Sequence, residues 1–211
     1  MVNWNLVFFY ASLIGSILVL LYLCYRFFYK RYTVESNIPN GASFSVRVTR
    51  VGDGDGFKAI HKPMLRSTRI FGKQGVVKKE LPTLSFRLAG IDAPEIRAFG
   101  KPEQPHARES KVFLSYLVLY KKIKVKVVGH DHYGRLIVVA YVGTWLFRKC
   151  VNLMLVETGM ACVYVGANAM YGGYKETMLS MQKHAQRRRL GMWTNRNAIT
   201  PMEHKKMYRK I

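Results

Sequence analysis

No charged side chain occurs between Met1 and Tyr25. Within this stretch, the run over residues 4–25 (WNLVFFYASLIGSILVLLYLCY) has only one asparagine and two serines as polar interruptions. As an α-helix it would be roughly 33 Å long, enough to cross a hydrocarbon core of about 30 Å. Tryptophan and tyrosine lie near its two ends, where aromatic rings favour the membrane interface. We therefore expect a single transmembrane helix over residues 4–25.

Two other roles of an apolar N-terminal run compete with this interpretation. A secretory signal peptide has basic residues before its apolar core and small residues at a cleavage site after it. Here Arg26, Lys30 and Arg31 follow the run, and the residues around Cys24 are bulky. A helix of a soluble core is disfavoured because no face of the run is polar. Since positive residues favour the side that is not translocated, the following domain is expected on the cytosolic or matrix side.

The rest of the chain is strongly basic. Its 34 Lys and Arg against 12 Asp and Glu give a net charge of +22 over 211 residues. Such a charge attracts polyanions, either nucleic acid or an anionic membrane surface. An apolar fraction of 49% excludes a disordered tail protein. The three cysteines are too few for a disulfide scaffold and lack the CxxC spacing of a zinc or redox motif.

One domain is expected over residues 43–194, after a basic juxtamembrane linker at 26–42 and before a basic C-terminal tail at 195–211. Alternation of apolar and polar residues predicts strands, and helical periodicity predicts helices. The expected strands are 44–51, 57–61, 84–91, 123–128 and 135–141, and the expected helices are 103–120, 145–158 and 174–190. The basic, irregular segment 62–83 indicates a surface insertion. This order favours an α+β fold, a small barrel with helices packed on it, over a parallel βαβ sheet.

The few acidic residues are grouped at the ends of predicted strands. Asp53 and Asp55 share the glycine turn GDGDG, and Asp92 opens the sequence Asp-Ala-Pro-Glu directly after a strand. Grouped carboxylates repel each other unless a cation or several arginines lie between them, and hard oxygen ligands suit Ca²⁺ or Mg²⁺ better than zinc. Each group is also compatible with ordinary turn chemistry. An EF-hand is excluded, because position 12 counted from Asp53 is Met64 rather than glutamate.

Two arginines extend this candidate site. Arg87 lies in the predicted strand that leads into Asp92, and Arg135 follows the turn His-Tyr-Gly. Guanidinium groups bind phosphate through two hydrogen bonds and stay charged at any working pH. A divalent ion, two arginines and a carboxylate are the components of metal-assisted phosphodiester hydrolysis. Taken alone, each arginine is equally compatible with an ordinary surface ion pair.

Three motifs taken together are more specific. The chain resembles the staphylococcal nuclease (thermonuclease) family in these motifs, which in order are VGDGDGFK at 51–58, FRLAGIDAPE at 86–95 and HYGRLIVVAYV at 132–142. The similarity covers roughly residues 44–194. The N-terminal span, the stretch FGKPEQP at 99–105 and the C-terminal tail look like the fungal membrane-anchored probable endonucleases of mitochondria. The resemblance implies an α+β fold built on a five-stranded OB-type β-barrel with about three packed helices, and a mitochondrial location.

The resemblance also implies an activity, the Ca²⁺-dependent endonucleolytic hydrolysis of phosphodiester bonds in DNA or RNA, with no small-molecule cofactor. The metal ligands would be Asp55, Asp92 and the backbone carbonyl of Ala93. Glu95 would be the general base that takes a proton from the attacking water. Together with Glu95, the catalytic residues would be the phosphate-binding Arg87 and Arg135.

One departure from the family pattern concerns Gly56, which stands where the family often carries threonine; the lost hydroxyl would weaken metal binding. Two further functions stay open from the residues alone. One is a binding module for nucleic acid or protein on the same barrel, and the other is a membrane protein whose basic face binds anionic lipid. Because the carboxylates and arginines of the motifs are all present, the sequence favours an active enzyme. Its preference for DNA or RNA and its oligomeric state have no signal in the sequence.

Overall fold

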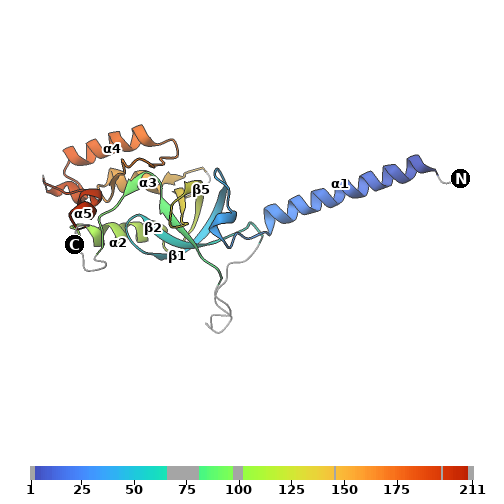
Figure 1. Ribbon diagram of the computed structural model, residues 1–211, viewed down its shortest axis with the longest axis horizontal. Helices are drawn as coiled ribbons and strands as arrows, with labels where there is room; N and C mark the ends of the chain where they lie inside the picture. The colour runs from blue at the N-terminus through green and yellow to red at the C-terminus, as the bar shows by residue number, and fades with distance from the viewer. Residues whose placement is uncertain (1–2, 66–80, 97–101, 145, 196, 209–211) are drawn as a thin grey trace.

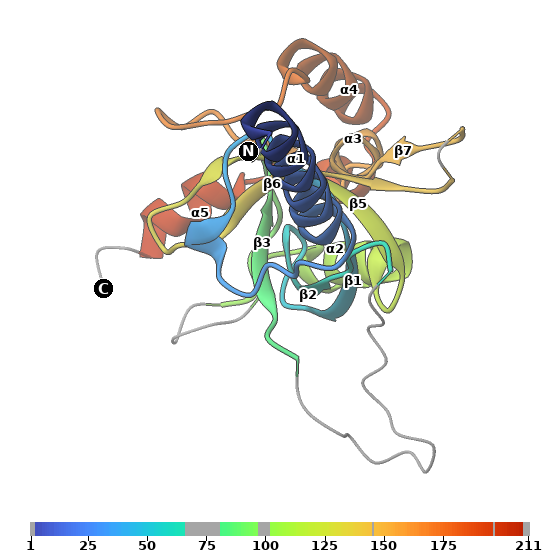
Figure 2. The same cartoon turned by 90° about the vertical axis from the view of Figure 1, so that its right-hand side faces the viewer.

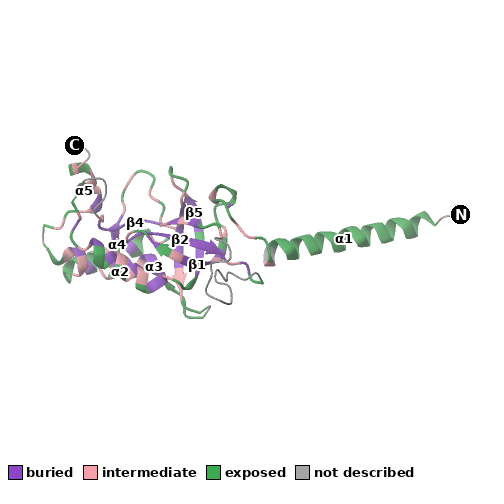
Figure 3. Ribbon diagram, turned by 90° about the horizontal axis from the view of Figure 1, so that it is seen from below, coloured by how far each residue is buried: buried purple, intermediate pink, exposed green. Residues whose placement is uncertain are grey.

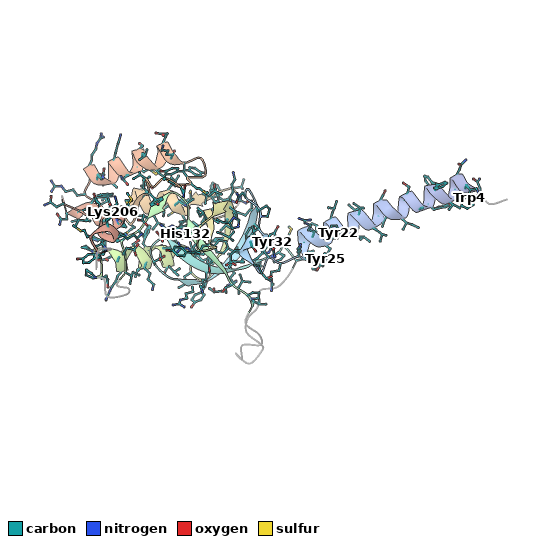
Figure 4. All side chains as sticks on the ribbon, in the orientation of Figure 1. Trp4, Tyr22, Tyr25, Tyr32, His132 and Lys206 are labelled. Carbon is teal, nitrogen blue, oxygen red and sulfur yellow. The ribbon has the colours of Figure 1, made fainter. Side chains whose placement is uncertain are left out.

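The computed structural model describes residues 3–65, 81–96, 102–144, 146–195 and 197–208. A long helix, α1 (Trp4–Phe28), projects from a domain of strands and shorter helices (Figure 1). Its side chains are exposed from Trp4 to Arg26 (Figure 3). Trp4 lies at its outer end, and Tyr22 and Tyr25 lie at the end next to the domain (Figure 4). By length and composition this helix could cross a membrane, as the sequence predicts.

A closed five-stranded barrel forms the centre of the described part of the domain. Strand β1 pairs antiparallel with both β2 and β5, and the parallel pairing of β3 with β6 closes the barrel. Alternate residues point inward, and the β1 residues Val46 and Val48 are wholly buried. The strands are β1 (Ser43–Val51), β2 (Gly56–His61), β3 (Leu84–Leu88), β5 (Lys122–His130) and β6 (Leu136–Val142). This confirms the predicted OB-like barrel.

Helices gather on the side of the barrel away from α1 (Figures 1 and 2). α2 buries Leu114, Leu117 and Val118 in the same core as the barrel strands, because these apolar positions repeat at helical spacing. α4 buries Met178 and Ala185. The helices and helical turns are α2 (Ala107–Val118), α3 (Val151–Glu157), α4 (Lys175–Arg187), η2 (Gly191–Thr194) and α5 (Pro201–Met207). The sequence predicted α2, α3 and α4 as helices, and α5 was missed within the tail at 195–211.

Two predicted elements are each divided in the structure, and the helix expected over 103–120 is shorter, at Ala107–Val118. The strand expected over 84–91 is two strands, β3 and the short β4 (Ile91–Asp92), because Gly90 turns the chain with φ +70°. The helix expected over 145–158 begins only at Val151, because β7 (Lys149–Cys150) pairs with the end of β6. β4 pairs with β8 (Cys162–Val163). Most of the insertion predicted at 62–83 lies outside the described residues.

The segment between α1 and the barrel is packed against the domain. The Tyr32 amide donates to Nδ1 of His61, 2.9 Å away. The short helical turn η1 (Glu35–Asn37) follows, and Glu35 Oε1 accepts from the Ser85 amide at 2.8 Å. Ile38 is buried in the barrel core. The segment that follows α1 is therefore fixed to a defined part of the barrel.

Candidate active site

Two buried carboxylates meet at one end of the barrel. Asp55 ends the turn between β1 and β2, and Asp92 lies in β4. The backbone joins the two segments, since the Leu88 amide donates to the carbonyl of Asp55 and the Ala93 amide lies 3.4 Å from Asp55 Oδ2. Only 4% of Asp55 and 1% of Asp92 is exposed. The fold therefore places two carboxylates together where water can solvate neither of them.

Arg87 lies between these two carboxylates. One of its Nη atoms is 2.8 Å from Asp92 Oδ1 and 3.2 Å from Asp55 Oδ2. Burial opposes the guanidinium charge, but Asp55 and Asp92 outweigh burial and raise the pKa of Arg87. Burial also raises the pKa of the Asp55 carboxyl well above its usual range, an effect that Arg87 reduces and that Asp53 and Asp92 increase. One arginine therefore neutralises this pair only in part.

A second cation reaches the site from the far end of the chain. Lys205 of α5 places Nζ 3.0 and 3.2 Å from the two oxygens of Asp92 and 2.8 Å from Glu95 Oε1. Burial opposes the ammonium charge, but Asp92 and Glu95 outweigh it and raise the pKa of Lys205. The structure thus places Glu95 beside Asp92 through a shared lysine.

Gln104 connects the loop of Glu95 to the C-terminal segment. Its side-chain Oε1 accepts from the Glu95 backbone amide at 3.1 Å, and its backbone amide donates to the Glu95 carbonyl at 2.9 Å. Its Nε2 donates to the carbonyl of Ile199, just before α5, at 2.6 Å. Gln104 is 4% exposed. A buried side chain that satisfies two backbone groups, together with the bond from the Gln104 backbone amide, fixes the position of the Glu95 backbone.

Arg135 directly precedes the neighbouring strand, β6. β6 pairs with β3 in the register Leu136–Phe86, so Arg135 lies beside the strand that carries Arg87. Arg135 Nε is 2.6 Å from Asp131 Oδ2, and the Arg135 amide donates to Asp131 Oδ1 at 2.8 Å. Burial alone would raise the pKa of Asp131, but the hydrogen bonds from Arg135 outweigh it and lower that pKa. Arg135 is thus held by Asp131 and not by Asp55 or Asp92.

A cavity opens next to Arg135. It has a volume of about 520 Å³, and its lining residues include Glu35 of η1, Ser85, Tyr133 and Arg135. The Tyr133 ring is 74% exposed and lies 5.4 Å from the Arg135 guanidinium. An exposed aromatic ring can stack on a planar group of a ligand, and an arginine beside it can bind a phosphate of the same ligand.

The donor set fits a hard divalent cation. Among the described residues, no three Asp, Glu, His or Cys side chains form a metal-binding group of their own. Asp55 and Asp92 both offer carboxylate oxygens, the kind of ligand that Ca²⁺ prefers. The part assigned to the Ala93 carbonyl stays a prediction from the sequence. Lys205 Nζ contacts both oxygens of Asp92 and so already marks a position for positive charge.

The model of the family described as "Staphylococcal nuclease homologue" matches residues 85–195 of this chain, a range that includes Arg87, Asp92 and Arg135. The chain belongs to the staphylococcal nuclease family. Three relatives, each named "Probable endonuclease LCL3", are similar over nearly their whole length. The protein of Candida tropicalis is 36% identical, over 89% of this chain and 86% of its own. The protein of Yarrowia lipolytica is 33% identical, over 96% and 94%, and that of Komagataella phaffii is 31% identical, over 88% and 86%.

Within this nuclease family, Gly56 has a structural explanation here. A Cβ atom at Gly56 would lie 2.8 Å from Asp53 Oδ1, too close for a normal contact. That same oxygen faces the Asp55 amide at 3.4 Å. Asp53 therefore supports the turn that presents Asp55, and glycine at position 56 gives Asp53 the room to do so.

The structure brings together most of the site residues that the sequence of this nuclease-family chain predicted. Arg87, Asp55 and Asp92 are in direct contact, Ala93 follows Asp92 in the chain, and Glu95 is joined to Asp92 through Lys205. Arg135 is separate from this cluster and directly precedes the adjoining strand, β6. Three residues were missed by the sequence analysis: Gln104, Asp131 and Lys205. Of these three residues, only Asp131 lies close in sequence to the residue that it contacts, four positions before Arg135.

Proposed function

We propose that this protein is a membrane-anchored, Ca²⁺-dependent endonuclease that hydrolyses phosphodiester bonds in DNA or RNA. The observation that carries the proposal is the contact of two buried carboxylates, Asp55 and Asp92, with Arg87 beside Glu95. The relatives named as probable endonucleases support the same activity. A net charge of +22 supports a polyanionic substrate.

Asp55, Asp92 and the Ala93 carbonyl would hold Ca²⁺. When bound there, the ion would polarise a phosphate oxygen and acidify a water molecule. The β1–β2 turn and β4 carry Asp55 and Asp92, and the contact of both carboxylates with Arg87 supports this assignment.

The side chains of this chain would perform the remaining steps. Glu95 would take a proton from the attacking water, in line with the bond that breaks. Arg87 and Arg135 would balance the negative charge that develops on the phosphate oxygens. Asp131 would hold Arg135 toward the cavity, and Tyr133 would stack on a base of either DNA or RNA. In this structure Arg87 is paired with Asp55 and Asp92, and Glu95 is paired with Lys205. These ion pairs must open before Arg87 and Glu95 can act on a substrate.

A Ca²⁺-dependence assay tests this function. The full chain, in phosphatidylcholine nanodiscs, should cleave single-stranded DNA with Ca²⁺ and lose cleavage when the ion is chelated. Asp92→Asn removes a metal ligand and should lower cleavage at saturating substrate by at least about 100-fold. Salt-sensitive DNA binding with no cleavage in either condition would instead indicate a binding module.

The membrane anchor is tested separately. We propose that α1 crosses the membrane once, in the mitochondrion, with the domain on the cytosolic or matrix side. The proposal rests on an apolar helix of sufficient length and on Arg26, Lys30 and Arg31 after it. The full chain should stay with membranes in alkaline carbonate. Ile14→Lys with Leu18→Lys should release it, because two charges at the centre of the bilayer are costly; full extraction of the wild type would contradict a spanning helix.

A further inference from the structure

Lys205 occupies the carboxylate site. Its ammonium group contacts both oxygens of Asp92 and one oxygen of Glu95, at 2.8–3.2 Å. Arg87 contacts the Asp92 Oδ1 atom as well, at 2.8 Å. Two cationic side chains therefore share one buried carboxylate, and one of them comes from a position 113 residues away in the sequence.

The segment that delivers Lys205 is attached at defined points. Thr200 begins α5 with a capping box, in which its side chain and that of Glu203 each bond the other's backbone amide. Pro201 and His204 are buried against the domain. Gln104 ties the carbonyl of Ile199 to the loop that carries Glu95. The packing of α5 against the domain thus determines the position of Lys205.

Lys205 and a metal ion need the same oxygen atoms. A Ca²⁺ ligand must offer its lone pairs to the ion, and both oxygens of Asp92 accept hydrogen bonds from Lys205 here. Keeping Lys205 in place as well would put three cationic groups around one carboxylate, with mutual repulsion in a site that water screens poorly. The Lys205 side chain is 41% exposed, so it has a path toward solvent.

We propose that Lys205 is an internal counter-cation that competes with Ca²⁺, so that docking of α5 keeps the site closed until the metal displaces this lysine. Lys205 holds Asp92 and Glu95 neutralised while the site lacks metal. Its departure frees the oxygens of Asp92 for the metal and the carboxylate of Glu95 for its role as a base. This inference rests on the assignment of Ca²⁺ to the carboxylates made above.

Calorimetric titration of Ca²⁺ into the full chain in nanodiscs tests the competition directly. Lys205→Gln should bind Ca²⁺ about tenfold more tightly than the wild type, because an occluding state populated to about nine-tenths lowers the apparent affinity by that factor. Lys205→Arg keeps a cation on α5 and should stay near the wild type. Lys206→Gln removes the same charge from the neighbouring, exposed residue and should leave the affinity unchanged.

The outcomes separate this inference from the nuclease assignment. Tighter Ca²⁺ binding by Lys205→Gln alone supports the competition, even if no variant cleaves DNA. Equal affinities in Lys205→Gln and the wild type overturn it, even if cleavage depends on Ca²⁺. Equal gains in Lys205→Gln and Lys206→Gln also overturn it, since they reflect net charge rather than occupancy. Absence of Ca²⁺ binding in every variant overturns both.

Discussion

At the scale of single residues, the orientation of Arg135 depends on Asp131. One oxygen of Asp131 accepts from the Tyr133 and Arg135 amides, and the other pairs with the Arg135 side chain. The turn and the arginine are therefore held by different atoms of one carboxylate. This division makes it possible to remove the ion pair while keeping the turn.

Asp131→Asn should separate these two roles. The amide oxygen can still accept from the two backbone amides, but the group facing Arg135 loses its charge. We expect kcat/KM for single-stranded DNA to fall by about tenfold with an unchanged melting temperature, as for other outer partners of active-site groups. The exposed Glu176→Gln serves as the control for charge. Unchanged kcat/KM, in a protein that Arg135→Ala inactivates, would show that Asp131 does not position Arg135.

His61 gives the fold a defined pH dependence. Burial, with a smaller contribution from Arg31, lowers the pKa of His61 to about 4, and its neutral Nδ1 accepts from the Tyr32 amide. Because the unfolded chain binds this proton near pH 6.5, the stability is present above that pH and is lost as the pH falls toward 4. From pH 7 to pH 5 the loss is about 2 kcal/mol.

Urea unfolding of the full chain, followed by tryptophan fluorescence at pH 7 and pH 5, measures this loss. His61→Asn retains an acceptor for the Tyr32 amide but does not titrate. The variant should therefore show a smaller drop in the free energy of unfolding between the two pH values. An equal drop in both proteins would assign the pH dependence to other groups.

Among single residues, the sequence could predict the members of the site that lie in motifs at the ends of strands. Asp55, Arg87 and Asp92 belong to short motifs whose strands pair in the barrel, so their convergence follows from the fold. Lys205 could not be predicted in the same way, because it lies 113 positions from Asp92 and is one lysine in a strongly basic chain. The Thr200–Glu203 capping box was a readable sign of a helix there, but it does not reveal what that helix faces.

At the scale of elements, the differences between expectation and structure have local causes. Gly90 divides one apolar run into β3 and β4, and this bend brings Asp92 to face Asp55. The run after residue 145 contains helical spacing, but its first part pairs with β6 as β7 before α3 begins. Tertiary pairing therefore decided both boundaries, and neither is visible in the periodicity of the segment alone.

α3 supports the site through one buried asparagine. Asn152 Oδ1 accepts from the Ala140 amide, and its Nδ2 donates to the carbonyls of Ala89 and Val138. The side chain is fully buried. It therefore links a helix, strand β6 and the turn that precedes Asp92.

Asn152→Ala should leave these backbone groups short of partners. We expect the free energy of unfolding, measured in urea, to fall by about 3 kcal/mol. The exposed Asn197→Ala should change it by less than about 0.5 kcal/mol. A loss below about 1 kcal/mol in Asn152→Ala would mean that water or repacking replaces the asparagine.

At the scale of the whole molecule, α1 and α5 lie at opposite ends. α1 leaves one side of the barrel, and α5, with the labelled Lys206 next to Lys205, lies on the other (Figures 1 and 4). A spanning α1 would thus leave Lys205 and the carboxylates that it contacts away from the bilayer, whereas the cavity beside Arg135 is lined in part by Glu35, soon after α1 in the chain. The net charge of the chain suits both a nucleic acid and an anionic lipid surface, so charge alone does not separate these partners.

The most direct test of the account replaces Glu95 by glutamine in the full chain. Glu95→Gln keeps the shape of the side chain but removes its ability to take a proton from water. With Ca²⁺ and single-stranded DNA, we expect cleavage to fall at least about 100-fold, while DNA binding and Ca²⁺ binding persist. Glu109→Gln, at an exposed position of α2, should cleave like the wild type. Wild-type cleavage by Glu95→Gln would contradict the site and the mechanism proposed for it.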